Sequence, residues 1–208
     1  MNICVCISGG GRSLANLLEY QKNTSWAVKL VISSSATCKG VDVARRAGIQ
    51  VVTYDFSSKS KAEEYLGLCI ELQKVFVEHQ IGLVVLAGFL KRFPEVAGYE
   101  GKVINIHPAL LPNFGGKGMY GMKVHEAVHK AREGVSGATV HFVNSVYDEG
   151  AIISQAQVKI LQKYLPEDIA NKVFEAECFL LPRTIDELVS GRLPLPHGKI
   201  QEMKLYDE

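Results

Sequence analysis

The sequence predicts an α/β fold with a doubly wound, mainly parallel sheet, helices on both faces and an antiparallel strand pair in the C-terminal half. Up to residue 106, apolar runs of strand length alternate with segments of helical periodicity, an order typical of parallel strands joined by crossover helices. Residues 83–87 are continuously apolar, as expected of a strand covered on both faces. After Pro112, two strand-like runs follow each other across a short polar segment, which favours an antiparallel pair.

The first half of the chain supplies the parallel part of this fold. Strands are expected at 2–7, 27–33, 51–54, 83–87 and 103–106. Helices are expected at 13–21, about 41–47 and 60–79. Gly48 ends the second helix, because glycine readily adopts the left-handed conformation found after a helix C-terminus. The third helix carries apolar residues at helical intervals: Leu66, Cys69, Ile70, Leu72 and Phe76.

The second half begins with a glycine-rich loop at 113–121 and then a helix at 123–132. The antiparallel pair is expected at 137–143 and 151–160. Pro166 starts a last helix that runs to about Val189, since proline is tolerated in the first turn and acidic residues follow it. Pro182 should break or kink that helix. The tail at 191–208 is expected to be loose.

The composition limits the class of protein. With 208 residues, 47% of them hydrophobic, the chain is expected to form one domain over 1–208. The 23 basic and 22 acidic residues nearly balance, which argues against a nucleic-acid partner. No apolar run reaches the length of a membrane span and no signal segment is recognised, so no membrane partner and a cytoplasmic location are expected. The five cysteines lack metal-type spacing, so no metal is expected.

Three segments carry candidate chemistry. The first is the turn Ser8-Gly-Gly-Gly-Arg-Ser13 between the first strand and the first helix. Glycines let backbone amides approach an anion, and a helix N-terminus adds partial positive charge, so this turn can bind phosphate. Glycine also serves tight turns by geometry alone. No acidic residue ends the second strand, so a phosphomonoester suits the turn better than a dinucleotide.

The second segment joins Asn105 and His107 with Asp148. Alternate residues of a strand share a face, so Asn105 and His107 emerge together where Pro108 ends the strand. An amide can donate to an oxyanion, and an imidazole can move a proton near neutral pH. A nearby carboxylate would raise the pKa of the imidazole. The alternatives are polar residues capping a strand end and a solvated loop aspartate.

The third segment is Leu86-Ala-Gly-Phe-Leu-Lys-Arg-Phe-Pro94, which follows a buried strand. Gly88 would let a flat ligand approach the backbone, and the aromatic residues beyond it offer an apolar lining. A strand-to-helix turn with core aromatics explains the same residues equally well.

Taken together, these segments resemble the phosphoribosylglycinamide formyltransferases of the folate-dependent formyltransferase superfamily. The superfamily pattern N-I-H-P-S-L-L-P corresponds to Asn105-Ile-His-Pro-Ala-Leu-Leu-Pro112, and L-A-G-F-M to Leu86-Ala-Gly-Phe-Leu90. The strand T-V-H-F-V with its Asp-Gly loop corresponds to Thr139–Val143 and Asp148-Glu-Gly150. The resemblance covers the chain from Ile7 to Glu177 and rests on three ordered blocks.

The resemblance implies transfer of a formyl group from 10-formyltetrahydrofolate, a co-substrate, to the amine of phosphoribosylglycinamide in purine biosynthesis. Asn105 would hold the oxyanion, and His107, kept cationic by Asp148, would stabilise it and act as the acid. The residues implied for the ribose phosphate substrate are Gly10, Gly11, Arg12, Ser13 and Glu177. Those implied for the folate are Lys61, Leu90, Lys91, Arg92, Phe93, Val143 and Asn144. Residues 1–100 would then form the phosphate-substrate half and 101–190 the catalytic and folate half.

The sequence departs from the family pattern at three places. Arg12-Ser13 replaces the common Ser-Asn, Ala109 replaces a serine, and Cys178 replaces a histidine after Glu177. Formyltetrahydrofolate deformylase, a hydrolase on the same core, is the alternative function, although it usually carries an N-terminal domain. The expected partners are small molecules, and the protein is expected to be a monomer or a homodimer.

Overall fold

The computed structural model describes residues 1–56, 62–193 and 201–205. The chain divides into two compact units, Met1–Ile104 and Asn105–Glu208. The predicted fold class, a doubly wound and mainly parallel α/β sheet with an antiparallel pair in the C-terminal half, is confirmed. The functional division of the chain near residue 100 stays a prediction.

The first unit is built on four parallel strands. They are β1 (Asn2–Ile7), β2 (Ala27–Ser33), β3 (Gln50–Thr53) and β4 (Ile81–Leu86), in the order β3-β2-β1-β4. The central strand β1 is fully buried from Ile3 to Ile7. The direction of winding reverses between β1 and β4, and open α/β sheets bind ligands at the carboxyl ends of strands beside such a reversal.

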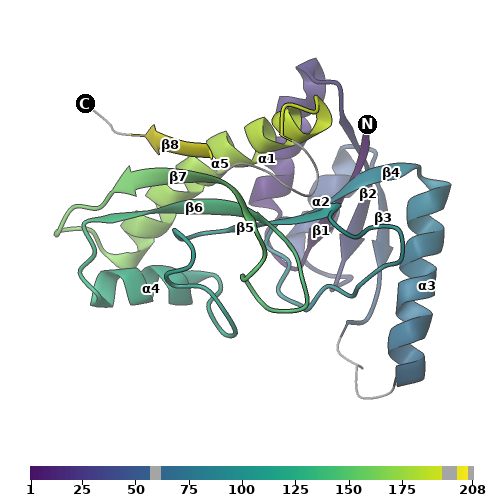
Figure 1. Cartoon of the computed structure of the whole chain (residues 1–208), viewed down its shortest axis with the longest axis horizontal. Helices are drawn as coiled ribbons and strands as arrows, with labels where there is room; N and C mark the ends of the chain where they lie inside the picture. Colours follow the sequence, from purple (N-terminus) through teal and green to yellow (C-terminus); the bar gives the residue numbers. More distant parts are fainter. Residues whose placement is uncertain (57–61, 194–200, 206–208) are drawn as a thin grey trace. The chain divides into compact units, whose positions relative to one another are not determined.

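The helices of this unit are α1 (Arg12–Tyr20), α2 (Lys39–Arg46) and α3 (Ala62–Glu78), with a short 3-10 helix, η1 (Gln21–Asn23), after α1. Crossover connections between parallel strands are right-handed. The chain therefore places α1 and α2, which contact each other, on one face of the sheet and α3 on the other. In Figure 1, α3 lies apart from α1 and α2. The first two residues expected in α3, 60 and 61, lie outside the described residues.

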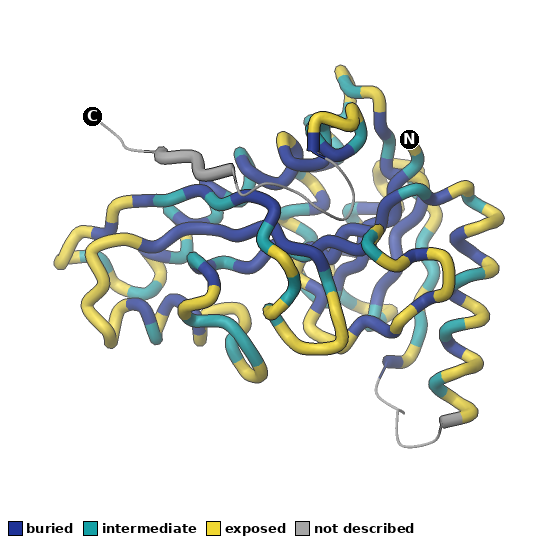
Figure 2. Tube along the Cα trace, viewed as in Figure 1, coloured by how far each residue is buried: buried dark blue, intermediate teal, exposed yellow. Residues whose placement is uncertain are grey.

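The second unit contains the last three residues of β5 (Val103–His107). The elements that follow in this unit are α4 (Met122–Lys130), β6 (Val135–Phe142), β7 (Ile152–Lys159), α5 (Pro166–Val189) and β8 (Gln201–Leu205). Strands β6 and β7 run antiparallel, with Val135 opposite Lys159. Helix α5 packs on both strands and α4 packs on α5 (Figure 1). Buried residues line β6 and β7, whereas exposed residues gather in the loops and on the outer turns of the helices (Figure 2).

Two expectations for this unit are corrected. Helix α5 continues through Pro182, so the break expected there is wrong, while the alternative of a kink stays a prediction. An internal proline costs about 3 kcal/mol, but the flanking Leu181 and Ile185 are buried, and each such side chain contributes about 1.5–3 kcal/mol. The tail is not loose throughout, since Gln201–Leu205 forms β8 beside β7 and parallel to it. An edge strand presents unpaired backbone N–H and C=O groups, and a segment can pair with them whatever its side chains are. The pairing with β7 therefore does not depend on the composition of the tail.

Candidate active site

Asn105 and His107 end β5, and Pro108 stops the strand as predicted. His107 is buried, with 3% of its surface exposed, whereas Asn105 is half-buried. The turn that follows is held firmly by Thr139 of β6. Its hydroxyl donates to Ala109 O at 2.6 Å and accepts the backbone N–H of Leu111 at 3.1 Å. Two hydrogen bonds from one side chain of β6 thus hold the turn that follows β5.

Asp148 lies in the loop between β6 and β7, where its backbone is left-handed with φ of 58°. Its side chain is 11% exposed, and its Oδ2 accepts the N–H of Gly116 at 2.9 Å. Oδ2 also lies 3.5 Å from His107 Nδ1. A Cβ built on Gly115 would stand 3.2 Å from the Asp148 Cβ, so this loop passes close to the aspartate. The structure therefore brings His107 and Asp148 together, and their catalytic roles stay predictions.

His141 is the residue that the sequence reasoning missed. It lies near the end of β6 and is 2% exposed. Its Nε2 is 3.0 Å from Asn105 Nδ2 and 3.5 Å from Asp148 Oδ1. His141 thus connects Asn105 to the His107–Asp148 pair. The signal in the sequence that could have found it is that His141 is the one titratable residue of β6.

The hydrogen bonds of His141 fix its tautomer. Its Nδ1 is 2.8 Å from Phe142 O, and a carbonyl only accepts, so Nδ1 carries a hydrogen. In the neutral ring Nε2 then has a free lone pair, which accepts an N–H from Asn105. This orients the Asn105 amide and leaves the second N–H of Nδ2 for another acceptor.

His107 has protein groups at both ring nitrogens. Its Nε2 donates to Phe114 O at 2.8 Å, and its Nδ1 faces Asp148. Burial lowers the pKa of His107 below its ordinary value of 6.5. The Asp148 carboxylate and the Phe114 carbonyl raise that pKa, but by less than burial lowers it. The expectation that Asp148 keeps His107 cationic is therefore corrected, because the neutral imidazole is favoured at this buried position.

Asp148 is held in its charged form. Burial by itself raises its pKa, but the hydrogen bond from His141, the charge of His107 and the Gly116 N–H together lower the pKa below its ordinary 3.8. The charge that His107 gives to this balance exists only while its ring is protonated. His107 favours the neutral form, and a neutral His141 with its hydrogen on Nδ1 has none on Nε2 to donate to Asp148. The Gly116 N–H at 2.9 Å is therefore the firmer cause of the ionised carboxylate.

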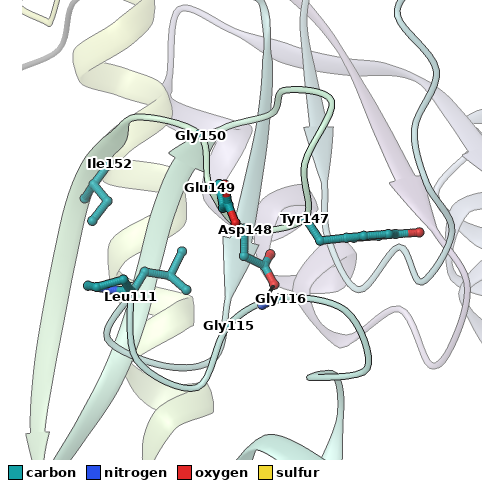
Figure 3. A pocket seen from close by; sticks show the side chains of 9 residues that line it. Leu111, Gly115, Gly116, Tyr147, Asp148, Glu149, Gly150 and Ile152 are labelled. Atoms are coloured by element: carbon teal, nitrogen blue, oxygen red, sulfur yellow. Dashed lines mark hydrogen bonds between the residues drawn. The ribbon is translucent and has the colours of Figure 1, made fainter.

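A cavity of about 490 Å³ opens beside Asp148. The residues that line it are Leu111, Pro112, Gly115, Gly116, Tyr147, Asp148, Glu149, Gly150 and Ile152. Figure 3 shows the Asp148 carboxylate turned toward Gly116, while the Tyr147 ring extends away from Leu111 and Ile152. One wall is therefore apolar and the other carries a carboxylate.

The predicted phosphate turn lies in the first unit. Gly11 is the N-cap of α1, with φ of 75°, and a Cβ on it would stand 2.5 Å from the Cα of Gly40. Glycine is thus required at Gly11 for both conformation and space. No heavy atom lies within 4 Å of a Cβ built on Gly10, and Arg12 is exposed with Ser13 half-buried. A helix N-terminus preceded by glycines favours an anion, and phosphate binding at this turn stays a prediction.

The residues implied for folate binding are distributed over both units. Leu90, Lys91 and Arg92 are exposed after β4, whereas Phe93 is buried with its ring 6.1 Å from that of Phe89. Lys61 lies outside the described residues. In the second unit, Val143 is half-buried and Asn144 is exposed at the end of β6. Glu177, which the resemblance assigns to the ribose phosphate substrate, is half-buried on α5. Their roles stay predictions.

Within 1–56, 62–193 and 201–205, no three His, Cys, Asp or Glu side chains gather in a way that could hold a metal ion. Over the same residues, no helix combines the length and the apolar character that crossing a bilayer requires.

Comparisons with known proteins agree on one family. Residues 1–185 match the family described as formyl transferase. The chain is 36% identical over 196 residues to the chloroplastic phosphoribosylglycinamide formyltransferase of Arabidopsis thaliana, covering 92% of this chain and 66% of that protein. It is 32% identical to phosphoribosylglycinamide formyltransferase of Escherichia coli, covering 94% of this chain and 90% of that protein.

A solved structure is similar over the whole chain. The phosphoribosylglycinamide formyltransferase of Anaplasma phagocytophilum matches with a TM-score of 0.83 and 28% identity, covering 100% of this chain and 99% of that one. The chain spans 66% and 62% of the two plant relatives. The resemblance drawn from the sequence is therefore confirmed, and the chain belongs to the formyl transferase family.

Proposed function

We propose that this chain transfers a formyl group from 10-formyltetrahydrofolate to the amine of phosphoribosylglycinamide, a step of purine biosynthesis. The observation that supports this most is the network of Asn105, His141, Asp148 and His107 at the end of β5, in a chain 32% identical to the E. coli enzyme of that name. The glycine turn before α1 fits the phosphate of the acceptor.

In this reaction the amine attacks the formyl carbon and forms a tetrahedral intermediate. Asn105 donates its second N–H to the oxygen on which negative charge develops. His107 accepts a proton from the attacking nitrogen and delivers it to the leaving nitrogen of the folate, which balances the transfer. The lowered pKa of His107 suits this sequence of proton transfers, because a neutral imidazole can accept a proton before it delivers one.

Asp148 then stabilises the imidazolium that forms between the two proton transfers. Its carboxylate oxygen Oδ2 lies 3.5 Å from His107 Nδ1, so the two opposite charges attract each other. His107 reaches the substrates when Phe114 O releases Nε2 and the hydrogen of the neutral ring moves to Nδ1, which faces Asp148. Nε2 then has the lone pair that accepts the proton. The remaining residues implied for the substrates keep the roles given by the resemblance, with Gly10–Ser13 and Glu177 toward the phosphate.

The test is an assay of the purified protein with both substrates, following release of tetrahydrofolate. We expect His107→Ala and Asp148→Asn each to lower kcat by about 10²–10⁴. Release of formate at the same rate without the amine would instead show a deformylase. Absence of turnover with both substrates, or full activity in both variants, would refute the proposal. His129→Ala, on an exposed turn of α4, is the matched control.

A further inference from the structure

Ser8 is the first residue after β1, at the point where the order of strands reverses toward β4. Its backbone N–H donates to Gly88 O at 3.1 Å, and the N–H of Ala87 donates to Cys6 O at 3.0 Å. The hydrogen bonds between β1 and β4 thus continue past the ends of both strands. Ser8 and Gly88 begin the two turns that leave the carboxyl edge of the sheet.

The Ser8 hydroxyl joins three strand ends. Its Oγ accepts the backbone N–H of Leu90 at 2.9 Å and lies 2.7 Å from Ser34 Oγ. Ser34, the residue after β2, donates its own N–H to Ile7 O at 3.1 Å. Since Oγ accepts from Leu90, its hydrogen is available to Ser34. One side chain therefore ties the ends of β1, β2 and β4 together.

Both turns held by Ser8 carry residues of the proposed function. The glycine turn starts at the next residue, Gly9, and Leu90 is the first residue of the segment assigned to folate. The buried side chains of Phe89 and Phe93 anchor that segment, while Leu90 itself is exposed. The bond to Ser8 is the contact that fixes the backbone at the exposed position.

We propose that Ser8 is a positioning residue that sets the geometry of the phosphate turn and the folate segment at the same time. This inference rests on the proposed function. Without the hydroxyl, the Leu90 N–H loses its partner and the segment samples other conformations before ligand binds. Binding then has to restore one conformation, so affinity falls while the chemical step, which depends on the second unit, is unchanged.

The experiment compares Ser8→Ala with Ser34→Ala. The first variant removes the acceptor of the Leu90 N–H, whereas the second leaves that bond in place and serves as the matched control. We expect Ser8→Ala to raise the KM for 10-formyltetrahydrofolate and for phosphoribosylglycinamide about 5- to 30-fold, the loss of roughly one hydrogen bond. We expect kcat to stay within about three-fold and Ser34→Ala to change each KM less than about three-fold.

Amide hydrogen exchange at Leu90 and calorimetric binding of tetrahydrofolate provide readouts that need no turnover. Ser8→Ala should speed exchange at Leu90 and weaken tetrahydrofolate binding, and Ser34→Ala should change neither appreciably. Faster exchange with unchanged binding would overturn the inference, as would unchanged exchange. If the wild-type protein fails to formylate, the proposed function falls, while exchange and binding still decide the role of Ser8.

Discussion

His141 provides the sharpest test of the network at the end of β5, because the sequence reasoning did not include it. His141→Phe keeps a ring of similar size in a position that is 2% exposed, so the packing cost is small. The variant removes both ring nitrogens. Phe142 O loses a donor at 2.8 Å, and Asn105 Nδ2 loses an acceptor at 3.0 Å.

The magnitude follows from the burial of these groups. A buried polar group without a partner costs about 1–3 kcal/mol, and Asn105, being half-buried, belongs at the low end. We therefore expect His141→Phe to lower the free energy of unfolding by about 2–4 kcal/mol. Loss of a fixed oxyanion donor costs about 10²–10³ in kcat. Because the Asn105 amide is loosened rather than deleted, we expect a fall of about 10–100-fold.

Urea unfolding followed by circular dichroism gives the first quantity, and formyl transfer at saturating substrates gives the second. His129→Phe, on an exposed turn of α4, controls for the substitution itself. Ordinary surface substitutions change the free energy of unfolding by up to about 0.5 kcal/mol. A His141→Phe protein whose free energy of unfolding stays within about 0.5 kcal/mol of the wild type, and whose kcat stays within about two-fold, would refute the reasoning.

Two further outcomes are expected. The pKa of His107 is lowered, so its neutral form contributes stability that is complete above pH 6.5 and is lost as the pH falls toward the folded-state pKa. The lowered pKa of Asp148 adds a further loss of stability below pH 3.8. The urea midpoint should therefore decrease on acidification, and His107→Gln should make the decrease near pH 6 smaller. A midpoint that rises on acidification would contradict the direction of both pKa shifts. Gly115→Ala places a Cβ 2.5 Å from Leu111 Cδ2 and 3.2 Å from Asp148 Cβ, and should cost about 1–3 kcal/mol and lower turnover. Gly134→Ala, whose Cβ would meet open space, should leave turnover unchanged, and equal behaviour of the two variants in the same assays would count against the steric argument.

Local patterns predicted the elements closely where burial follows from the sequence. The continuous apolar run at 83–87 became β4 with buried Leu83–Ala87, and Pro166 begins α5 with Asp168 accepting the N–H of Leu165. The helix break expected at Pro182 does not occur, since the packing of α5 on β6 and β7 outweighs the local penalty of the proline. The expectation of a loose tail, drawn from its composition, is likewise wrong for 201–205, where pairing with β7 decides the structure.

For the site, the sequence by itself determined the polar residues available at the end of β5 and the glycines that a close backbone approach requires. The tertiary structure alone decided which of them meet. His141 contacts Asn105 and Asp148 beside an irregularity in the β6–β7 register between Val140 and His141. The structure also decided the sign of the His107 pKa shift, because burial and the Asp148 charge oppose each other. Their balance depends on distances and solvent exposure, which arise only when segments distant in the chain pack together.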